Sequence, residues 1–184
     1  MLRRQRVLWL VIMCITIVSC SAEGESIPGD KNEPTAEAFE LSVPQGDVVL
    51  EVGGAIGRFN VANRALFDLD MLRSLPTVSV ETHTSVTDGV KRFEGFLLRD
   101  FLNGLGAKGD KVVASALNDY EMEIPMEDLR KFDVIVAYNM DGELLSPSNK
   151  GPLWIVYPRD DYPELQDIRY DYRWVWQLHS LKVE

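Results

Sequence analysis

The apolar residues of this chain fall into short stretches separated by turn-forming residues, and most of the stretches are typical of β-strands. Each combines alternating or consecutive apolar positions with β-branched or aromatic residues, a pattern that predicts a strand in a partly or fully buried sheet. The predicted strands cover residues 47–52, 77–82, 111–117, 120–124, 133–138, 152–157 and 174–183, and a further short apolar run covers 93–97.

Helical spacing of apolar residues is limited to three short segments. Residues 67–75 form the first, which Pro76 ends, and residues 98–105 form the second, which ends at a glycine. The third covers 126–131 and follows Pro125. Because strands dominate and the short helices do not alternate with them regularly, the pattern predicts an α+β domain with a mixed or antiparallel sheet.

The first twenty residues have the pattern of an export signal. Three arginines lie among the first six residues, and the apolar run 7–18 that follows is too short to span a membrane comfortably. Cys20 ends a stretch that resembles a bacterial lipobox, which implies a lipid anchor on that cysteine; the alternative is an ordinary signal cut after Ala22. Either reading predicts a periplasmic domain, and Ser21 after the cysteine resembles lipoproteins of the outer membrane where two membranes are present.

The segment 21–40 separates this signal from the globular part of the chain. It is rich in Glu, Pro, Gly, Ser and Ala and has no apolar period, so we expect a flexible tether. Residues 41–184 remain for one domain with its own core. The two cysteines of the chain are Cys14 and Cys20, so this domain contains neither a thiol nor a disulfide.

The net charge of the chain limits the classes of molecule that it is expected to bind. It carries 19 basic and 29 acidic residues, and loss of a signal with three arginines leaves 16 basic residues and a net charge of −13. Such a domain is expected to repel nucleic acid and anionic lipid surfaces. The predicted contact with a membrane is therefore made only through the N-terminal lipid anchor.

Five segments follow one another in the order and with the residue types of a known family. Together they resemble the molybdopterin-binding domain of sulfite-oxidase-type oxidoreductases, from Val78 to the end of the chain. The resemblance implies that family's α+β fold. The segments are 93–102 (FEGFLLRDFL), 116–125 (ALNDYEMEIP), 136–145 (VAYNMDGELL), 151–158 (GPLWIVYP) and 173–183, in which Arg173-Trp174 precedes Leu181-Lys182-Val183.

Two departures from the family pattern change the expected chemistry. Where the family places the thiolate that holds molybdenum, residues 80–85 read Val-Glu-Thr-His-Thr-Ser, and the domain has no other thiol. Trp154 stands where the family usually has an arginine beside the phosphate-bearing tail of the cofactor. Both changes disfavour the complete molybdenum cofactor and favour a small, flat, uncharged ligand. We therefore predict a bound pterin without molybdenum and, on balance, no enzymatic activity.

A pterin needs aromatic faces for stacking and paired polar groups at its amide and amino edges. We include His83 among the predicted ligand residues because it lies beside the position of the missing cysteine. A structural role is the alternative interpretation for these residues, since aromatic residues in strands usually belong to the core and a lone histidine is usually a surface residue. The predicted ligand residues are Trp154, Tyr157, Tyr120 and Trp174, with Trp176 as a further aromatic face, and the polar residues Asn118, His83, Thr84, Asn139 and Arg173.

The acidic stretch 160–171 is interpreted as a surface loop without a functional role. Its carboxylates predict a solvated loop, and neighbouring Arg159 and Arg169 predict exposed ion pairs of little energetic weight. Two histidines without a thiol or ordered carboxylates predict no zinc or iron site, and no G-x-S-x-G nucleophile motif occurs.

The resemblance also implies a biological role. Some exported relatives without the cysteine act as pterin-binding regulators of a membrane enzyme that makes or degrades cyclic di-GMP. The predicted function is therefore a non-catalytic periplasmic pterin-binding domain that regulates such a membrane partner. Two alternatives stay open: a molybdopterin-dependent oxidoreductase subunit, and a structural lipoprotein with a vestigial pocket.

Overall fold

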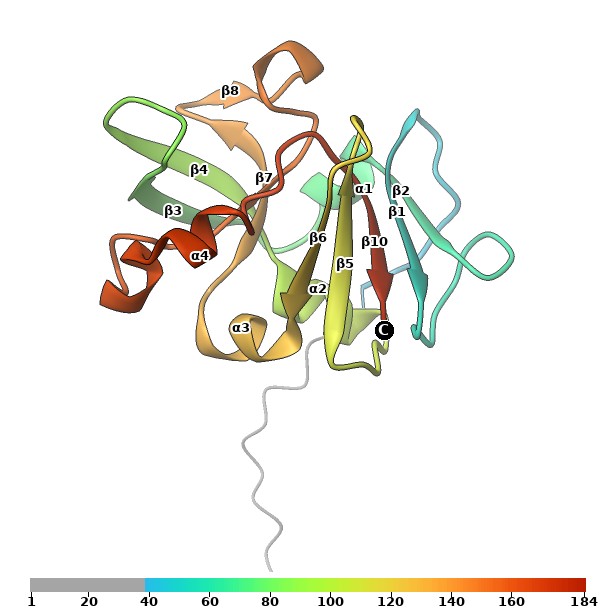
Figure 1. Ribbon diagram of the computed structural model, residues 1–184. Helices are drawn as coiled ribbons and strands as arrows, with labels where there is room; N and C mark the ends of the chain where they lie inside the picture. The colour runs from blue at the N-terminus through green and yellow to red at the C-terminus, as the bar shows by residue number, and fades with distance from the viewer. Residues whose placement is uncertain (1–38) are drawn as a thin grey trace, which may run out of the picture. The chain divides into compact units, whose positions relative to one another are not determined.

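The computed structural model describes residues 39–184, which contain two sheets and several short helices (Figure 1). The predicted signal and nearly all of the predicted tether lie outside these residues. The strands are β1 (Val48–Gly54), β2 (Ala65–Asp68), β3 (Val78–His83), β4 (Val90–Leu97), β5 (Lys111–Ala116), β6 (Glu121–Pro125), β7 (Ile135–Met140), β8 (Glu143–Leu144), β9 (Trp154–Val156) and β10 (Leu178–Val183). The helices are α1 (Leu69–Arg73), α2 (Leu98–Gly104), α3 (Met126–Lys131) and α4 (Ile168–Asp171), with 3-10 turns η1 (Pro147–Asn149) and η2 (Pro163–Gln166).

The strands form two sheets of five strands each. The first sheet has the order β2-β1-β10-β5-β6, in which β1 and β10 run parallel and the other neighbours run antiparallel. The second has the order β3-β4-β7-β8, and β9 also pairs with β7. This arrangement confirms the predicted α+β class with a mixed sheet.

One continuous core joins the two sheets and the helix α2. In β5 every second residue is buried, so its alternating sequence places one face on the core. The central strand β7 has four consecutive buried residues and β9 is buried throughout, because β7 has neighbours on both sides and both faces are covered. Among the described residues, no helix is long and apolar enough to cross a membrane.

Gly95 explains one element of the family resemblance. A Cβ atom at this position would lie 2.1 Å from the carbonyl oxygen of Val136 and 2.7 Å from the Cα atom of Ala137. The register between β4 and β7 shifts between Glu94 and Gly95, so the two backbones approach closely at this irregularity. A side chain here would force the central strands of the second sheet apart.

The prediction of a helix over 67–75 was wrong in its first part. Phe67 belongs to β2, where it pairs with Leu50, and only Leu69–Arg73 form helix α1. Asp68 is the last residue of β2, and its carboxylate accepts a hydrogen bond from the Met71 backbone N–H (2.9 Å) and so caps α1. That bond and further backbone N–H donors from Gly46 and Gln45 lower the pKa of Asp68.

The prediction of a strand over 174–183 was also too long. β10 begins at Leu178, because Gln177 adopts a left-handed backbone conformation (φ 51°) that interrupts the extended chain. Trp174 and Trp176 therefore lie before the strand, and Trp176 makes an isolated bridge to Trp154 of β9.

Candidate functional site

A cavity of about 220 Å³ lies between the turn that joins β5 to β6 and the segment that joins α4 to β10. In Figure 1 this segment leaves α4 on the side of the second sheet and reaches the first sheet at β10. The lining is mostly aromatic with an amide and a carboxylate at its border. The lining residues are Ala116, Asn118, Tyr120, Asp171, Tyr172, Trp174 and Trp176.

Hydrogen bonds hold the two walls of the cavity together. The turn is closed by the Ala116 N–H, which donates to the Tyr120 carbonyl (2.8 Å), and Asn118 Oδ1 accepts from the Tyr120 N–H (3.2 Å). Across the cavity, the Tyr120 hydroxyl donates to the Tyr172 carbonyl (3.0 Å). The Leu117 N–H donates to the Gln177 carbonyl (2.9 Å) at the base of the other wall. The two walls of the cavity are thus held in place by bonds within the chain itself.

The aromatic wall has an exposed member and a supporting layer. Trp176 is 38% exposed and Trp174 is 5% exposed, and both lie in the lining. Behind them, Trp154 makes edge-to-face contacts with both indoles, at ring-centroid distances of 6.2 Å to Trp174 and 6.4 Å to Trp176. Trp154 also packs against Phe93 at 5.2 Å. These contacts fix the angles at which the two lining indoles stand.

The predicted ligand-stacking role of Trp154 needs a correction. The residue is 0% exposed, because β9 lies inside the core and carries it there, so no face of its indole is free for a ligand. Its Nε1 atom is buried and has no acceptor among the described residues, and the Lys150 ammonium lies 5.9 Å from its ring centroid. Trp154 therefore acts on the cavity through Trp174 and Trp176.

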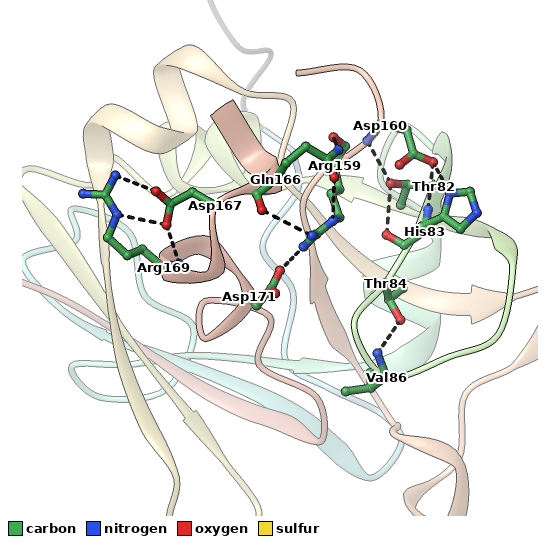
Figure 2. Close-up of polar contacts among 10 residues, drawn as sticks. All are labelled: Thr82, His83, Thr84, Val86, Arg159, Asp160, Gln166, Asp167, Arg169 and Asp171. Carbon is green, nitrogen blue, oxygen red and sulfur yellow. Dashed lines mark hydrogen bonds and ion pairs between the residues drawn. The ribbon is translucent and has the colours of Figure 1, made fainter. Parts of the chain in front are cut away.

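Asp171 brings a carboxylate to the border of the aromatic cavity. Its Oδ1 atom pairs with the Arg159 guanidinium, and each of the two side chains is only 18% exposed. Figure 2 shows Arg159 between Asp171 and Gln166, whose Oε1 accepts from Arg159 Nε (3.2 Å). The prediction of a solvated loop with exposed ion pairs was wrong for this pair, since η2 and α4 fold the stretch and cover it.

His83 lies at the end of β3, beside the position where the resemblance places the family's metal-binding cysteine. Its Nδ1 atom and its backbone N–H both contact Asp160 Oδ2, at 2.8 Å and 2.9 Å (Figure 2). Burial raises the pKa of Asp160, but the two bonds from His83 and the nearby charges, including that of Arg159, together hold that pKa below its usual value. Thr84 bonds Thr87 through the two hydroxyls (2.8 Å). His83 and Thr84 do not belong to the lining of the cavity.

Tyr157 and Arg173 belong to a buried network rather than to the cavity. The Tyr157 hydroxyl donates to Asp128 Oδ2 (3.0 Å), and Arg173 pairs with the same oxygen atom. Burial, followed by the negative charge of Asp128, raises the pKa of Tyr157 well above its usual value. Arg173 also lies over the ring of Tyr170, 4.8 Å from its centroid. Tyr157 and Arg173, which the sequence predicted as ligand residues, thus lie in this network and outside the lining of the cavity.

Asn139 has a local role. Its Oδ1 atom accepts a hydrogen bond from the Gly142 N–H (3.0 Å) and closes the turn between β7 and β8. Of the predicted ligand residues, the structure thus brings Asn118, Tyr120, Trp174 and Trp176 together around one cavity. It places Trp154, Tyr157, His83, Thr84, Asn139 and Arg173 elsewhere.

Sequence reasoning missed Asp171 and Tyr172 as lining residues. The signal that was present is their position directly before Arg173-Trp174, a pair that carries part of the family resemblance. Nothing in the sequence pairs Asp171 with Arg159, because the contact depends on how η2 and α4 turn the chain back.

Comparison with known proteins agrees with this architecture. Residues 43–160 match the model of the oxidoreductase molybdopterin binding domain. The chain therefore belongs to the oxidoreductase molybdopterin binding domain family. A search of curated proteins returned no match to the chain. The matched region begins before β1 and includes the 116–120 turn, whereas the other wall of the cavity, residues 171–176, lies beyond its end.

The metal-binding half of the family's cofactor does not fit the residues of this domain. Residues 39–184 contain no cysteine, so no thiolate is present to hold molybdenum. His83, beside the expected ligand position, contacts Asp160 Oδ2 through its Nδ1 atom (2.8 Å). The described part of the chain contains no group of three or more His, Cys, Asp or Glu side chains that could hold a metal ion.

Proposed function

We propose that the domain binds a pterin in the cavity between the 116–120 turn and the 171–176 segment, and that it does so without molybdenum chemistry. The observation that carries this proposal is the composition of one small cavity, which combines the indoles of Trp174 and Trp176 with the carboxylate of Asp171. Membership of a molybdopterin-binding family supports a pterin as the ligand class.

The volume of the cavity favours a small heterocycle. Pockets for drug-sized ligands usually enclose roughly 300–1,000 Å³, whereas a cavity of about 150 Å³ holds benzene. At about 220 Å³ this cavity matches a single fused bicycle better than a pyranopterin with its phosphate-bearing tail. The acidic surface of the chain, with a net charge of −10, also disfavours an anionic tail.

Asp171 supplies the polar recognition that such a bicycle requires. A pterin presents two neighbouring donors, its N3–H and its 2-amino group, on one edge of the ring. A carboxylate can accept both hydrogen bonds. Among residues 39–184, Arg159 bonds Asp171 Oδ1, and Oδ2 has no hydrogen-bond partner. The ion pair with Arg159 fixes the position of the carboxylate. In this arrangement Trp176 and Trp174 contact the ring faces while Asp171 binds the edge.

Replacement of Asp171 by asparagine should weaken pterin binding by about 1.5–3 kcal/mol, or about tenfold and more, because the bonds to a charged acceptor are lost. Titrations followed by quenching of tryptophan fluorescence measure this change. Lumazine is the matched ligand, since it carries an oxo group in place of the 2-amino group. The native protein should prefer 6-hydroxymethylpterin over 6-hydroxymethyl-lumazine, and D171N should lose most of that preference.

Asp167→Asn is the matched control variant. Asp167 pairs with Arg169 at the start of the same helix but is not part of the cavity lining, so D167N should bind as the native protein does. Native protein that binds no pterin would overturn the proposed function. Native binding that D171N leaves unchanged would overturn only the role of Asp171.

We further propose the cellular setting that the sequence predicts: export to the periplasm, a lipid anchor at Cys20, and regulation of a membrane partner with a cyclic di-GMP output. The signal pattern and the apolar-poor segment 21–40 support export and an anchor. The regulatory role is supported by the resemblance to exported relatives without the cysteine. Labelling of Cys20 by a clickable palmitate analogue tests the anchor, and Cys20→Ser should abolish the label.

A further inference from the structure

The strand β3 forms one edge of the second sheet. It pairs with β4 alone, so one side of its backbone has no strand neighbour in the described part of the chain. Exposed edges of this kind are sites at which an extended segment of another chain can add as a further strand. This feature lies apart from the cavity and from the proposed pterin function.

The direction of the free backbone groups follows from three contacts. The His83 N–H points away from β4, because it donates to Asp160. On the neighbouring strand β4, the Arg92 N–H and carbonyl point toward the β7 side, because both bond Asp141, which directly follows β7. Arg92 lies opposite Glu81, so this facing pair exchanges no backbone hydrogen bonds. Along a strand, the backbone N–H and carbonyl groups of residues two apart point to the same side. The groups of Ser79 and Glu81 therefore point outward, as those of His83 do.

Only half of this edge is covered. Asp160 closes the end of the strand, where its carboxylate bonds His83 and its N–H donates to Thr82 Oγ1 (3.2 Å). Beside Ser79 and Glu81, the surface is hollowed by a groove of about 590 Å³. The groove is lined by Val78, Ser79, Val80, Glu81, Arg92, Asp133, Pro158, Asp161 and Tyr162. The open half therefore has both free backbone groups and room beside them.

The charged residues that line the groove favour a cationic ligand. Arg92 pairs with Glu94, and Asp133 pairs with Arg99, so these charges are compensated. Glu81 and Asp161 also line the groove, and neither forms an ion pair within residues 39–184. A second copy of the chain would bring a further Glu81 and a net charge of −10 against them. Lysine or arginine side chains complement the groove instead.

We propose that β3 is a docking edge for an extended, basic segment of a partner protein, which adds as a strand beside Ser79 and Glu81. Backbone hydrogen bonds to these two residues hold the segment in register, and its cationic side chains pair with Glu81 and Asp161. The proposal concerns a protein partner and does not depend on what the cavity binds.

The test uses nuclear magnetic resonance of the purified protein with a short acetylated peptide of alternating lysine and valine. A matched peptide carries glutamate in place of lysine. Only the lysine peptide should bind, and binding should slow hydrogen exchange of the Ser79 and Glu81 amides, because both become hydrogen-bonded. The Val80 amide already faces β4, so its exchange should change least.

A pair of charge reversals completes the test. Glu81→Lys should weaken binding of the lysine peptide by about fivefold. Glu143→Lys makes the same change in net charge on the exposed strand β8 and should leave binding unchanged. Absence of binding by the lysine peptide, equal binding of the glutamate peptide, or unchanged exchange at Ser79 and Glu81 would overturn the proposal. Formation of a dimer through β3 would also overturn it, in favour of a second copy.

Discussion

Replacement of Asp128 by alanine is expected to lower the free energy of unfolding by about 3–5 kcal/mol, a large fraction of the stability of a domain of this size. Asp128 is only 7% exposed, and one of its oxygen atoms serves both the Tyr157 hydroxyl and the Arg173 guanidinium. Removal of the carboxylate leaves a partly buried cation and a buried hydroxyl without their acceptor. Equilibrium unfolding in urea measures the loss.

Asp133→Ala is the matched control for that variant. Asp133 follows the same helix α3 and pairs with Arg99, but its side chain is 59% exposed, so its removal should change the urea midpoint little. Equal shifts for the two variants would show that the Asp128 network contributes no more than a surface ion pair. That result would contradict the structural role assigned to Tyr157 and Arg173.

Trp176→Ala is expected to weaken pterin binding by about 1–3 kcal/mol, the usual cost of removing an aromatic side chain on which a flat heterocycle stacks. Trp176 is 38% exposed and lines the cavity, so its removal should cost binding without unfolding the domain. Titration of the variant with 6-hydroxymethylpterin, followed by isothermal calorimetry, measures the change directly.

Phe59→Ala supplies the comparison for Trp176→Ala. Phe59 is 43% exposed, close to the exposure of Trp176, but is not part of the cavity lining. Its replacement should leave affinity unchanged. If Trp176→Ala binds as tightly as the native protein, the ligand does not stack on this indole and the assigned cavity is wrong.

Local pattern was sufficient to predict most of the elements. Alternation in residues such as those of β5, the glycine after 98–104 and the proline before α3 act over short distances and need no tertiary information. The errors arose where tertiary contacts decide the outcome. Phe67 stands four residues before Met71, which is helical spacing, yet pairing with Leu50 places it in β2.

The site was predictable only in part, for a related reason. The turn residues Asn118 and Tyr120 and the indole of Trp174 were found through the resemblance, and the fold brings them to one cavity. Residue type alone could not show which of Trp154 and Trp176 lines the cavity, because both are tryptophans in segments that carry the resemblance. The two residues differ in exposure. Trp154 belongs to β9, which lies inside the core, whereas Trp176 directly precedes Gln177, where the extended chain is interrupted before β10.

Asp171 illustrates what sequence cannot provide. An acidic residue among other acidic residues predicts a solvated loop, and that interpretation holds for Asp167 with its exposed partner Arg169. Asp171 differs because η2 and α4 turn the chain so that Arg159 reaches it beside the cavity. The distinction depends on contacts between residues that are distant in the sequence.

Native mass spectrometry of the purified protein tests the central claim most directly, because one spectrum reports both the organic ligand and any metal. We predict that the protein, alone or after incubation with a reduced pterin, carries the added mass of one pterin per chain and no molybdenum. An added mass that corresponds to a molybdenum-loaded cofactor would contradict the account, and so would a protein that takes up no pterin at saturating concentration.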